Sequence, residues 1–488
     1  MKLLDLSRLF REAIYNHSPI FIQNLLLSAY GACLHRQRYH GAAGEYTRQL
    51  LASQWFQPEE FEAMQIKTMR LLLKHCADNV PYYQKIFKQI GFNWTDFTRL
   101  EHIKKLPFLE KSTLQQRLDE FLPIHPSGAG RAKNKMVAFY TSGTTGQPLT
   151  VYKTITAIRQ TWAFLERFRT WAGVKEGDRR ATFSGRLIVP PNSKNNIFWR
   201  YNAAGNQMLF SSYHLSEKNL PYYIEKLNAW QPVIIDGYPS AIYLISKYIV
   251  NRRLACPAMA VEGTIKPKAV LVTAETLLPF QREAIETAFQ AKVFNQYSSS
   301  EGAVWITECE KGGLHLNPES GILEILINDT DAPPDREGEI VISSFLTEGT
   351  PLIRYKIGDY AVRSTGNCPC GRKMPLVSEI SGRKDDYIYT ETHGYVGRLD
   401  PLFKGLSPSI LETQIIQENK KELLVKMVTA PDFKKEFLAP FVQELKKRVG
   451  EEILIKFDFV NQIPRDKRGK FKSVVSKINS LAKSTNSP

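Results

Sequence analysis

Cysteine is scarce in this sequence, with 6 residues among 488. That number is too small for a disulfide-linked scaffold and agrees with a reducing compartment. The sequence also lacks internal repeats and tracts dominated by proline, glycine or a single residue type, which argues against solenoid, collagen-like and disordered proteins. With 43% hydrophobic and 23% charged residues, the composition is that of a globular chain.

A secretory leader and a long hydrophobic run are missing as well. The first residues contain no apolar signal core followed by a small-residue cleavage site. Residues 18–34 lean apolar, but the stretch is short for a membrane span and holds Gln23 and Asn24 in its middle. We expect a cytoplasmic protein in which 18–34 forms a buried or interfacial helix. The pattern of residues 1–50 does not decide between a dimer contact and a membrane-surface helix.

Negative charge is in deficit, since 65 Lys and Arg face 49 Asp and Glu and give a net charge of +16. Such a field attracts nucleotides, acidic sugars, nucleic acid or an anionic membrane face. The sequence has no basic stripe interleaved with aromatics, no zinc-finger spacing and no RNA-binding sheet signature, so we expect no specific nucleic-acid partner. Peripheral association with a membrane surface stays open.

The length predicts at least two domains. Residues 1–135 are rich in helical patterns. One such pattern covers 61–76, and Pro81 interrupts the helical run that follows it. Short β-type runs then alternate with helical ones, which is typical of an α/β domain with buried strands. Beyond residue 382 the pattern becomes β-rich and closes with a helix over 440–449 and a strand over 452–460. The expected strands cover 136–141, 181–183, 233–235, 269–272, 292–294 and 339–342, and the expected helices cover 155–171, 240–250 and 278–290. We place the domain boundary between residues 381 and 382, with a hinge at 382–386.

A hydroxyl- and glycine-rich loop follows the first expected strand. Its residues are Thr141, Ser142, Gly143, Thr144, Thr145 and Gly146. Hydroxyl donors and close-approaching backbone N–H groups suit phosphate oxygens. The loop lacks the Gly-Lys-Ser/Thr ending of a P-loop, so it does not predict an ordinary NTPase. A surface loop between two strands is the alternative.

Further segments downstream carry groups that a nucleotide site needs. Tyr297 precedes Glu301 by four residues, so an aromatic ring for a purine comes just before a carboxylate for magnesium. Asp359 follows Gly358 at the expected end of a strand, where its carboxylate can accept both ribose hydroxyls. Taken singly, the tyrosine could be a core aromatic and the aspartate a turn cap.

The remaining segments lie near the expected hinge, at the C-terminus and at one strand-to-helix turn. Arg383 and Asp385 stand at the hinge, and Lys470 follows a glycine near the C-terminus. Taken singly, these could be a surface ion pair and a solvated lysine. Gly237, Tyr238 and Pro239 form a turn of the kind at which α/β ligand pockets form, with Phe183 and Arg186 as further candidate lining residues.

In combination, these motifs resemble the adenylate-forming superfamily. The resemblance extends over nearly the whole chain and is narrowest to the phenylacetate–CoA ligase-like group and its CapK-type, capsule-biosynthesis branch. It implies an α/β fold with a large N-terminal adenylation domain of mixed sheets and helices, residues 1–381. It also implies a small mobile α+β C-terminal lid domain, residues 382–488, which carries the catalytic lysine.

The resemblance implies that a carboxylic acid reacts with ATP to give an acyl-adenylate and pyrophosphate. Loop 141–146 would hold phosphates, Glu301 would bind Mg²⁺, and Lys470 would neutralise charge in the transition state. Arg383 would contact the ribose or phosphates and Asp385 would be the hinge. The nucleotide-binding residues would further include Thr273, Ala274, Glu275, Tyr297, Ser300 and Asp359, and the acyl pocket would include Gly237, Tyr238 and Pro239.

Two pairs of potential metal ligands lie between the nucleotide motifs. Cys309 and His315 form one pair, and Cys368 and Cys370 form the other. Four such ligands suit a tetrahedral structural Zn²⁺, although buried cysteines that only pack are an alternative. Relatives with a similar Cys-x-Cys-Gly-Arg run are expected to hold a structural metal. The other three cysteines, Cys33, Cys76 and Cys256, are expected in the core.

The acceptor of the activated acyl group stays open. After Asp386 the sequence departs from CoA ligases of the group, and residues 393–394 are typical of a hairpin tip. An amine, an amino sugar or a carrier-bound glycan is therefore an alternative to CoA, which would place the enzyme in polysaccharide or secondary-metabolite biosynthesis. Two other hypotheses are a nucleotidyl transferase that leaves AMP on its substrate and a non-catalytic basic docking module in a polysaccharide assembly complex.

Overall fold

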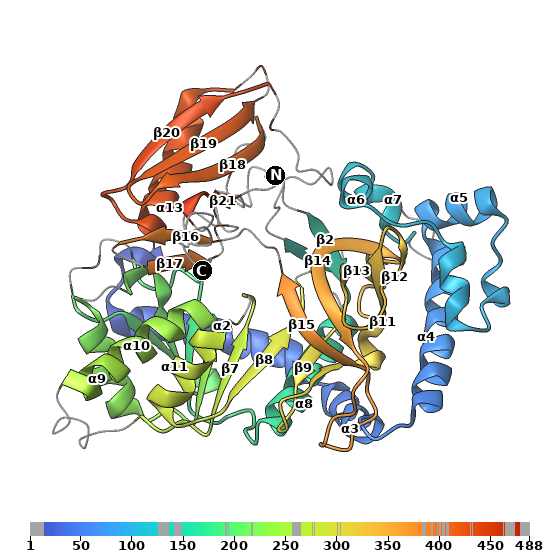
Figure 1. The fold of residues 1–488 in the computed structure, drawn as a ribbon, viewed down its shortest axis with the longest axis horizontal. Coiled ribbons are helices and arrows are strands. Elements are labelled where there is room, and N and C mark those ends of the chain that lie inside the picture. Colours follow the sequence, from blue (N-terminus) through green and yellow to red (C-terminus); the bar gives the residue numbers. More distant parts are fainter. Residues whose placement is uncertain are drawn as a thin grey trace, which may run out of the picture. The chain divides into compact units, whose positions relative to one another are not determined.

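Two units make up the chain (Figure 1): residues 1–41 with 169–295 form unit 1, and residues 42–168 with 296–488 form unit 2. The structure is a computed structural model. It describes residues 14–124, 136–140, 149–190, 193, 195–215, 218–255, 265–275, 277, 279–299, 301–302, 304–382, 387–391, 394–397, 399, 402, 406, 409–429, 431, 433–461, 463 and 474–478.

Unit 1 is built on buried, mostly parallel strands. Its strand order is β4-β5-β3-β6-β7, with β3 parallel to both β5 and β6, β6 parallel to β7, and β4 antiparallel to β5. The strands are β3 (Arg180–Ser184), β4 (Trp199–Asn202), β5 (Gln207–Ser211), β6 (Ile234–Gly237) and β7 (Ala269–Thr273). In β7 the run Ala-Val-Leu-Val is buried throughout, because a parallel strand inside an α/β layer is covered on both faces.

Helices alternate with strands as the pattern predicts. Unit 1 contains α9 (Leu220–Trp230), α10 (Pro239–Ala255) and α11 (Pro279–Phe289), whereas α8 (Ile155–Trp171) precedes β3 and lies mostly in unit 2. The predictions for 155–171, 240–250 and 278–290 are thereby confirmed to within a few residues. Helix α10 packs against α9 and α11, and the three lie side by side in Figure 1. Strand β8 (Val293–Tyr297) then carries the chain from unit 1 into unit 2.

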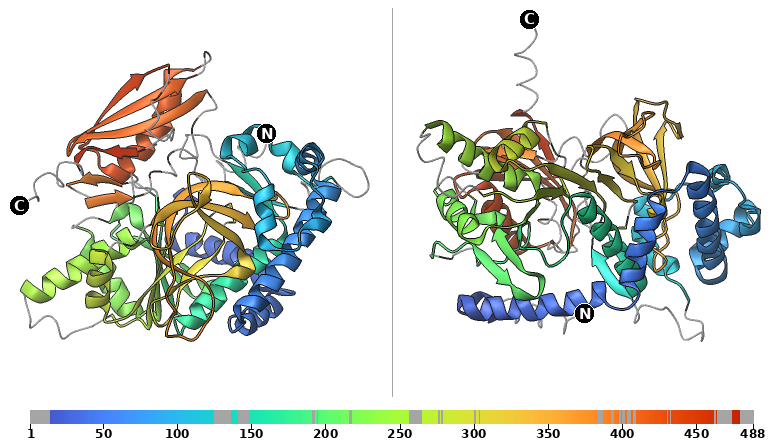
Figure 2. Two further views of the ribbon diagram at one scale, coloured as in Figure 1. Left: turned by 45° about the vertical axis from the view of Figure 1, so that its right-hand side comes forward. Right: turned by 90° about the horizontal axis from the view of Figure 1, so that it is seen from below.

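Helix α2 (Ile20–Tyr39) is the long N-terminal helix of unit 1. It packs beside β4 and the short helix η4 (Ala203–Gly205), and it runs along the edge of this unit in the right-hand view of Figure 2. A helix was predicted for residues 18–34 and is found, but much of it is exposed. Cys33 lies on its exposed surface, so the expectation of a core position for this cysteine was wrong.

Unit 2 begins with helices, and for two of them the sequence marks the first turn with a proline. Pro58 occupies the first turn of α4 (Pro58–Asn79), where Gln57 and Glu60 form a reciprocal capping box. Pro81 opens α5 (Pro81–Ile90) directly after α4 has ended, which confirms the predicted interruption. The other helical segments of this part are α3 (Ala43–Ser53), η1 (Trp94–Asp96), η2 (Leu100–Lys105), α6 (Lys111–Gln116) and α7 (Leu118–Phe121).

An antiparallel sheet forms the centre of unit 2. Its strand order is β12-β11-β13-β14-β15-β10-β9. The strands are β9 (Ile306–Glu308), β10 (Leu314–Leu316), β11 (Gly321–Ile327), β12 (Thr330–Asp331), β13 (Glu337–Ser344), β14 (Tyr355–Ser364) and β15 (Leu376–Gly382), with η7 (Pro318–Ser320) between β10 and β11. Separately, β1 (Val137–Tyr140) and β2 (Thr150–Lys153) form an antiparallel pair. One core joins residues of α4, such as Met69 and Leu73, to strand residues such as Ile340.

The C-terminal part is a small α+β arrangement with its own core, which includes Leu423, Val425 and Leu445. Its sheet has the order β20-β19-β18-β21. The elements are β16 (Tyr387–Thr390), β17 (Gly394–Gly397), β18 (Ile410–Asn419), β19 (Glu422–Thr429), η8 (Lys435–Leu438), α13 (Ala439–Val449), β20 (Leu454–Phe459) and β21 (Val474–Ser476). Strands β16 and β17 pair as the expected hairpin. The domain boundary at residue 382 stays a prediction.

Candidate active site and metal centre

The predicted site residues fall into two groups, those that the structure describes and those that it does not. Outside the described residues lie Thr141, Ser142, Gly143, Thr144, Thr145, Gly146, Ser300, Arg383, Asp385 and Lys470. The described ones are Gly237, Tyr238, Pro239, Thr273, Ala274, Glu275, Tyr297, Glu301, Asp359, Cys309, His315, Cys368 and Cys370.

Tyr297 and Asp359 are brought together in unit 2. Tyr297 is the last residue of β8, and its phenol Oη donates a hydrogen bond of 2.8 Å to Oδ2 of Asp359 on β14. The two residues are 62 positions apart in the chain. The residues predicted to stack on adenine and to bind ribose therefore share one site.

The expectation that β14 ends at Gly358-Asp359 was wrong. The strand continues to Ser364, and its pairing with β13 shifts register between Glu339 and Val341. Gly358 has a φ of +85° beside this irregularity. A bulge re-aims a side chain without ending the ladder, so Asp359 lies within a strand.

Arg354 anchors the start of β14. Its guanidinium forms a two-pronged ion pair with Glu324 of β11, at 2.8 and 3.0 Å. It also donates to the carbonyl of Leu106 at 2.8 Å. Both charged groups are buried, and their bidentate geometry compensates for the desolvation. Arg354 thus has a structural role close to the candidate nucleotide site.

Glu301 is buried and faces a lysine that sequence reasoning missed. Lys153, the last residue of β2, is 4% exposed and interacts electrostatically with Glu301. Burial lowers the pKa of Lys153 from 10.5 to about 8, and the Glu301 carboxylate opposes this change. Gly302 packs closely against Thr347 and Lys153. A Cβ at this position would lie 2.8 Å from the Thr347 side chain and 3.1 Å from the Lys153 Nζ. One signal in the sequence could have found Lys153, namely a lysine at the end of the strand that leaves the hydroxyl-rich loop.

The turn at 237–239 lies in unit 1, between β6 and α10. Gly237 has a φ of +143°, and a Cβ at this position would lie 1.9 Å from the Phe183 carbonyl oxygen. The same carbonyl accepts a hydrogen bond from the Tyr238 N–H at 2.8 Å. Phe183 itself is fully buried and stacks on Phe210, and its place in an acyl pocket stays a prediction. Only glycine fits this close approach of two strands.

The segment 273–275 is hydrogen-bonded to the start of α10, directly after the turn at 237–239. A carboxylate oxygen of Glu275 accepts a hydrogen bond of 3.2 Å from the Ser240 N–H in the first turn of α10. Ala274 has a φ of +75°, which is rare for a residue with a side chain and is found at functional turns. The predicted nucleotide segment and the predicted acyl segment of unit 1 therefore adjoin each other.

The four predicted metal ligands converge in unit 2. One ligand atom each from Cys309, His315, Cys368 and Cys370 lies within 4.8 Å of the others. The Sγ atoms of Cys309 and Cys368 are 3.5 Å apart, and the Cys370 Sγ is 3.3 Å from the His315 Nε2. Cys309 lies directly after β9, His315 lies on β10, and Cys368 and Cys370 lie in the loop before β15, although Cys309 and Cys368 are 59 residues apart.

The surroundings of this cluster fit a bound cation. A Cβ at Gly313 would lie 2.7 Å from the Cys368 Sγ and 3.3 Å from the His315 Nε2, so glycine keeps the space open. Burial lowers the pKa of His315 to about 4, which leaves the imidazole neutral and able to bind a metal. Burial also raises the pKa of Cys309 to about 12. A Zn²⁺ ion would reverse that effect, because coordination deprotonates thiols.

Comparison with known proteins identifies the family. The chain is 32% identical to Protein CapK of Staphylococcus aureus over 470 residues, which cover 95% of this chain and 99% of the relative. It belongs to the CapK family. The family model for the CapK C-terminal domain matches residues 388–477. Phenylacetate-coenzyme A ligase of Thermus thermophilus is 23% identical over 81% of this chain and 85% of its own length.

Solved structures agree with this assignment at the level of the fold. 2-Hydroxyisobutyryl-CoA ligase, in complex with 2-HIB-AMP and CoA in the thioesterification state, is 16% identical. It covers 90% of this chain and 94% of its own, with a TM-score of 0.57. The predicted superfamily, branch and α/β fold are thereby confirmed. The CapK-family chain described here therefore shares the fold of a ligase solved with an acyl-AMP.

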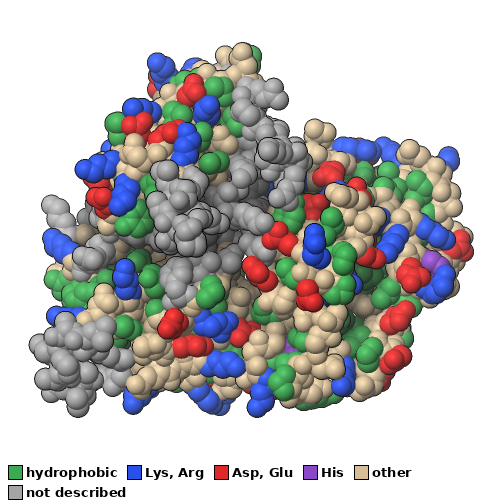
Figure 3. Space-filling model, in the orientation of Figure 1, with side chains coloured by type: hydrophobic (Ala, Val, Ile, Leu, Met, Phe, Trp, Pro, Cys, Tyr) green, Lys and Arg blue, Asp and Glu red, His purple; other side chains and the backbone are tan. Residues whose placement is uncertain are grey.

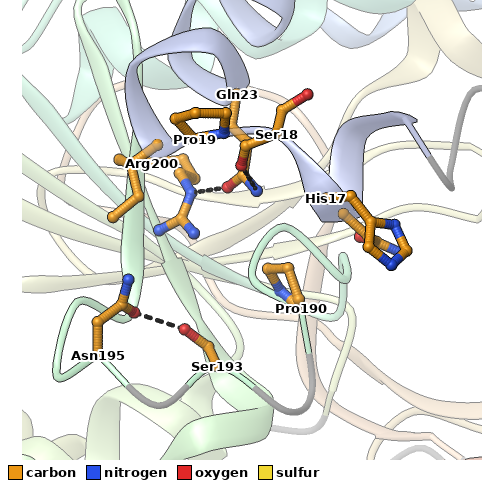
Figure 4. A pocket seen from close by; sticks show the side chains of 10 residues that line it. His17, Ser18, Pro19, Gln23, Pro190, Ser193, Asn195 and Arg200 are labelled. Atoms are coloured by element: carbon orange, nitrogen blue, oxygen red, sulfur yellow. Dashed lines mark hydrogen bonds between the residues drawn. The ribbon is translucent and has the colours of Figure 1, made fainter.

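A separate cavity of about 510 Å³ lies in unit 1 at the N-terminal end of α2. Figure 4 shows Gln23 beside Arg200 in its wall. Its lining residues are Asn16, His17, Ser18, Pro19, Ile20, Gln23, Pro190, Ser193, Asn195 and Arg200. None of them was predicted for the nucleotide or acyl site, and the Arg200 guanidinium already donates to Gln23 and to the Trp199 carbonyl.

Charged side chains are interspersed on the face drawn in Figure 3. Lys and Arg alternate there with Asp and Glu over the described surface, and they do not gather into one stripe. The expectation of no specific nucleic-acid partner stays a prediction. Among the helices that the structure describes, none is long and apolar enough to cross a membrane. The cytoplasmic location stays a prediction.

Proposed function

We propose that this enzyme activates a carboxylic acid with ATP and Mg²⁺ and then transfers the acyl group to a nucleophile. A carboxylate oxygen attacks the α-phosphorus of ATP, the bond from that phosphorus to the bridging oxygen breaks, and pyrophosphate leaves. The nucleophile then attacks the acyl carbon, and AMP departs with the acyl–oxygen bonding pair. The observation that carries the proposal is the 2.8 Å hydrogen bond from Tyr297 to Asp359, which unites the adenine and ribose residues.

Within this scheme, each group near the nucleotide has a distinct role. Asp359 accepts the ribose hydroxyls while Tyr297 holds its carboxylate in place. Glu301 binds Mg²⁺, which supplies charge stabilisation on the phosphates. Lys153 is a positioning residue that acts through Glu301, because a buried ammonium orients the carboxylate opposite it. The residues of the hydroxyl-rich loop, 141–146, with Ser300, bind phosphate, and Arg383 contacts the ribose or phosphates.

The C-terminal segment has the role of a lid in this proposal. Lys470 bridges the incoming carboxylate and the α-phosphate, and Asp385 is the hinge between the domains 1–381 and 382–488. The start of the CapK C-terminal domain match at residue 388 supports this division. In unit 1, the acyl pocket includes Gly237, Tyr238 and Pro239, and residues 273–275 line the nucleotide.

We assign the metal cluster a structural role. Zn²⁺ at Cys309, His315, Cys368 and Cys370 would tie the hairpin of β9 and β10 to the loop before β15. This link joins segments distant in the chain, and such a site contributes directly to folding free energy.

For the acceptor we propose an amine or an amino sugar, which fits polysaccharide or secondary-metabolite biosynthesis. The hairpin of β16 and β17 supports this choice, because the sequence there departs from the loop expected of CoA ligases. Coenzyme A is the second candidate, and the likeness to phenylacetate-coenzyme A ligases favours it. Hydroxylamine trapping distinguishes activation from transfer, since it captures any acyl-adenylate as a hydroxamate.

The test uses the full chain with Mg²⁺-ATP, a panel of aryl, hydroxy, amino and sugar acids, and hydroxylamine. A hydroxamate with any acid supports activation, and replacing hydroxylamine with CoA or an amine panel then identifies the acceptor. AMP found on the final product would instead support a nucleotidyl transferase. Absence of both hydroxamate and Mg²⁺-ATP binding would favour the non-catalytic docking module and overturn the proposal.

A further inference from the structure

Helix α2 presents an apolar face to the outside. Phe21, Leu25, Leu26 and Tyr30 are 70%, 64%, 41% and 60% exposed. At 100° per residue, these four positions fall within a 180° arc of the helix, which is its outer half. Cys33 is exposed as well. A surface helix of a globular protein ordinarily turns such a stripe towards its core.

The opposite face of α2 is polar and is fixed to unit 1 by hydrogen bonds. The Asn24 Oδ1 accepts from the Tyr201 N–H at 2.9 Å, and the Ser28 Oγ accepts from the Ala203 N–H at 2.9 Å. The Gln23 side chain accepts from the Arg200 guanidinium, as Figure 4 shows.

The remaining contacts confirm that this face is the inner one. A Cβ at Gly31 would lie 2.3 Å from the Asn202 Oδ1, so the backbone approaches β4 closely. His35 pairs with Glu176 at 2.5 Å, further along the same helix. The inner face of α2 is therefore mixed, because Leu27 also packs there against Ile188, Val189 and Leu209, whereas large apolar side chains point outward. Polar bonds hold the helix in place and leave its apolar side free for another surface.

Charge indicates which surface that is. Residues 13–44 contain no Asp or Glu, and their Lys and Arg residues are Arg36 and Arg38, in the last turn of α2. Arg36 lies 15 residues after Phe21, which at 100° per residue places it on the apolar side. The whole chain carries a net charge of +16. A helix with an apolar face, arginines and no acid matches an anionic lipid surface.

We propose that α2 docks this chain on an anionic membrane, with Phe21, Leu25 and Leu26 inserted below the headgroups and Arg36 among the phosphates. A second copy of the chain fits less well. Pairing two α2 helices would bring together arginines with no acidic residue of α2 to oppose them, on two chains that each carry net positive charge. This inference is independent of the proposed chemistry.

The experiment measures co-sedimentation of the full chain with vesicles of phosphatidylcholine, with and without phosphatidylglycerol. The wild type is expected to bind the anionic vesicles and to dissociate as salt is raised. Phe21→Ser/Leu25→Ser is expected to bind at least about ten-fold more weakly, because two apolar side chains no longer insert. Arg36→Gln is expected to weaken binding to anionic vesicles only.

Leu71→Ser/Leu454→Ser is the matched control. These leucines are 63% and 54% exposed but lie on other elements, so this variant is expected to bind as the wild type does. Unchanged thermal melting of both double variants verifies the fold. The proposal is overturned if the wild type ignores anionic vesicles or if both double variants bind equally. It is also overturned if light scattering shows a dimer that only Phe21→Ser/Leu25→Ser dissociates while vesicle binding is absent.

Discussion

Replacing Lys153 with methionine is expected to stabilise the folded protein near neutral pH and to slow the ligase. Lys153 is 4% exposed, and burial lowers the pKa of its ammonium from 10.5 to about 8 despite the nearby Glu301 carboxylate. At about 1.4 kcal/mol per pKa unit, keeping this charge in the fold costs about 3 kcal/mol. Methionine fills similar space without the charge, so most of that cost is expected to disappear.

The pH dependence fixes the sign of this effect. The folded-state pKa of Lys153 is lower than the unfolded one, so the unfolded chain binds the extra proton between about pH 8 and pH 10.5. The penalty is complete below about pH 8 and fades as the pH rises to about 10.5. The stability advantage of Lys153→Met over the wild type should therefore shrink across that window.

The assay is guanidinium unfolding of both proteins at a neutral and an alkaline pH, together with the rate of ATP–pyrophosphate exchange. Lys67→Met is the control, because Lys67 is exposed on α4 and surface changes alter stability by roughly 0.5 kcal/mol at most. Exchange by Lys153→Met should fall by about ten-fold or more, since Glu301 loses the charge that orients it. A variant that is less stable than the wild type at neutral pH, or equally active, would refute the reasoning.

Three other outcomes are expected. Gly237→Ala should fail to fold or should melt at a markedly lower temperature, because its Cβ would overlap the Phe183 carbonyl; normal melting would contradict this. Removal of metal by a chelator, or Cys309→Ser, should lower the melting temperature, and elemental analysis should find about one Zn²⁺ per chain; a metal content near zero in the untreated protein would reject the site. Tyr297→Phe should cost about 1 kcal/mol of stability and raise the KM for ATP more than it changes kcat, because Asp359 loses its partner; an unchanged KM would argue against the shared site.

Much of the fold could be predicted because local rules and burial agree. The strand at β7 reads as an unbroken apolar run, and prolines at residues 58 and 81 mark the first turns of two helices. The same agreement holds for α8, whose bounds match the predicted 155–171. Local propensity and burial here favour one answer, so the sequence alone suffices.

The features that could not be predicted depend on contacts between distant segments. The orientation of α2, with its large apolar side chains outward, depends on bonds between Asn24 and Tyr201 and between Ser28 and Ala203, which no local pattern reveals. For the same reason Cys33 was predicted in the core, whereas it is exposed on α2. A second example is the bulge at Gly358, which depends on the register of β13.

The candidate site shows the same division. Residue types and order indicated Tyr297, Asp359 and the metal ligands, whereas their hydrogen bond and the convergence of the four ligands required the folded chain. Lys153 was missed because a lysine at the end of a short strand is usually solvated; its place after the hydroxyl-rich loop was a weak signal, and its burial in the folded chain distinguishes it.

The most direct test of the central claim is carboxylate-dependent ATP–pyrophosphate exchange without CoA, run over the same panel of acids. We expect exchange with at least one acid, loss by orders of magnitude in Lys470→Ala, and near wild-type exchange in the neighbouring control Lys472→Ala. Nucleotide binding by Lys470→Ala should survive, because the charge of this lysine acts mainly in the transition state. Absence of exchange together with absence of Mg²⁺-ATP binding in the wild type would contradict the proposed activation.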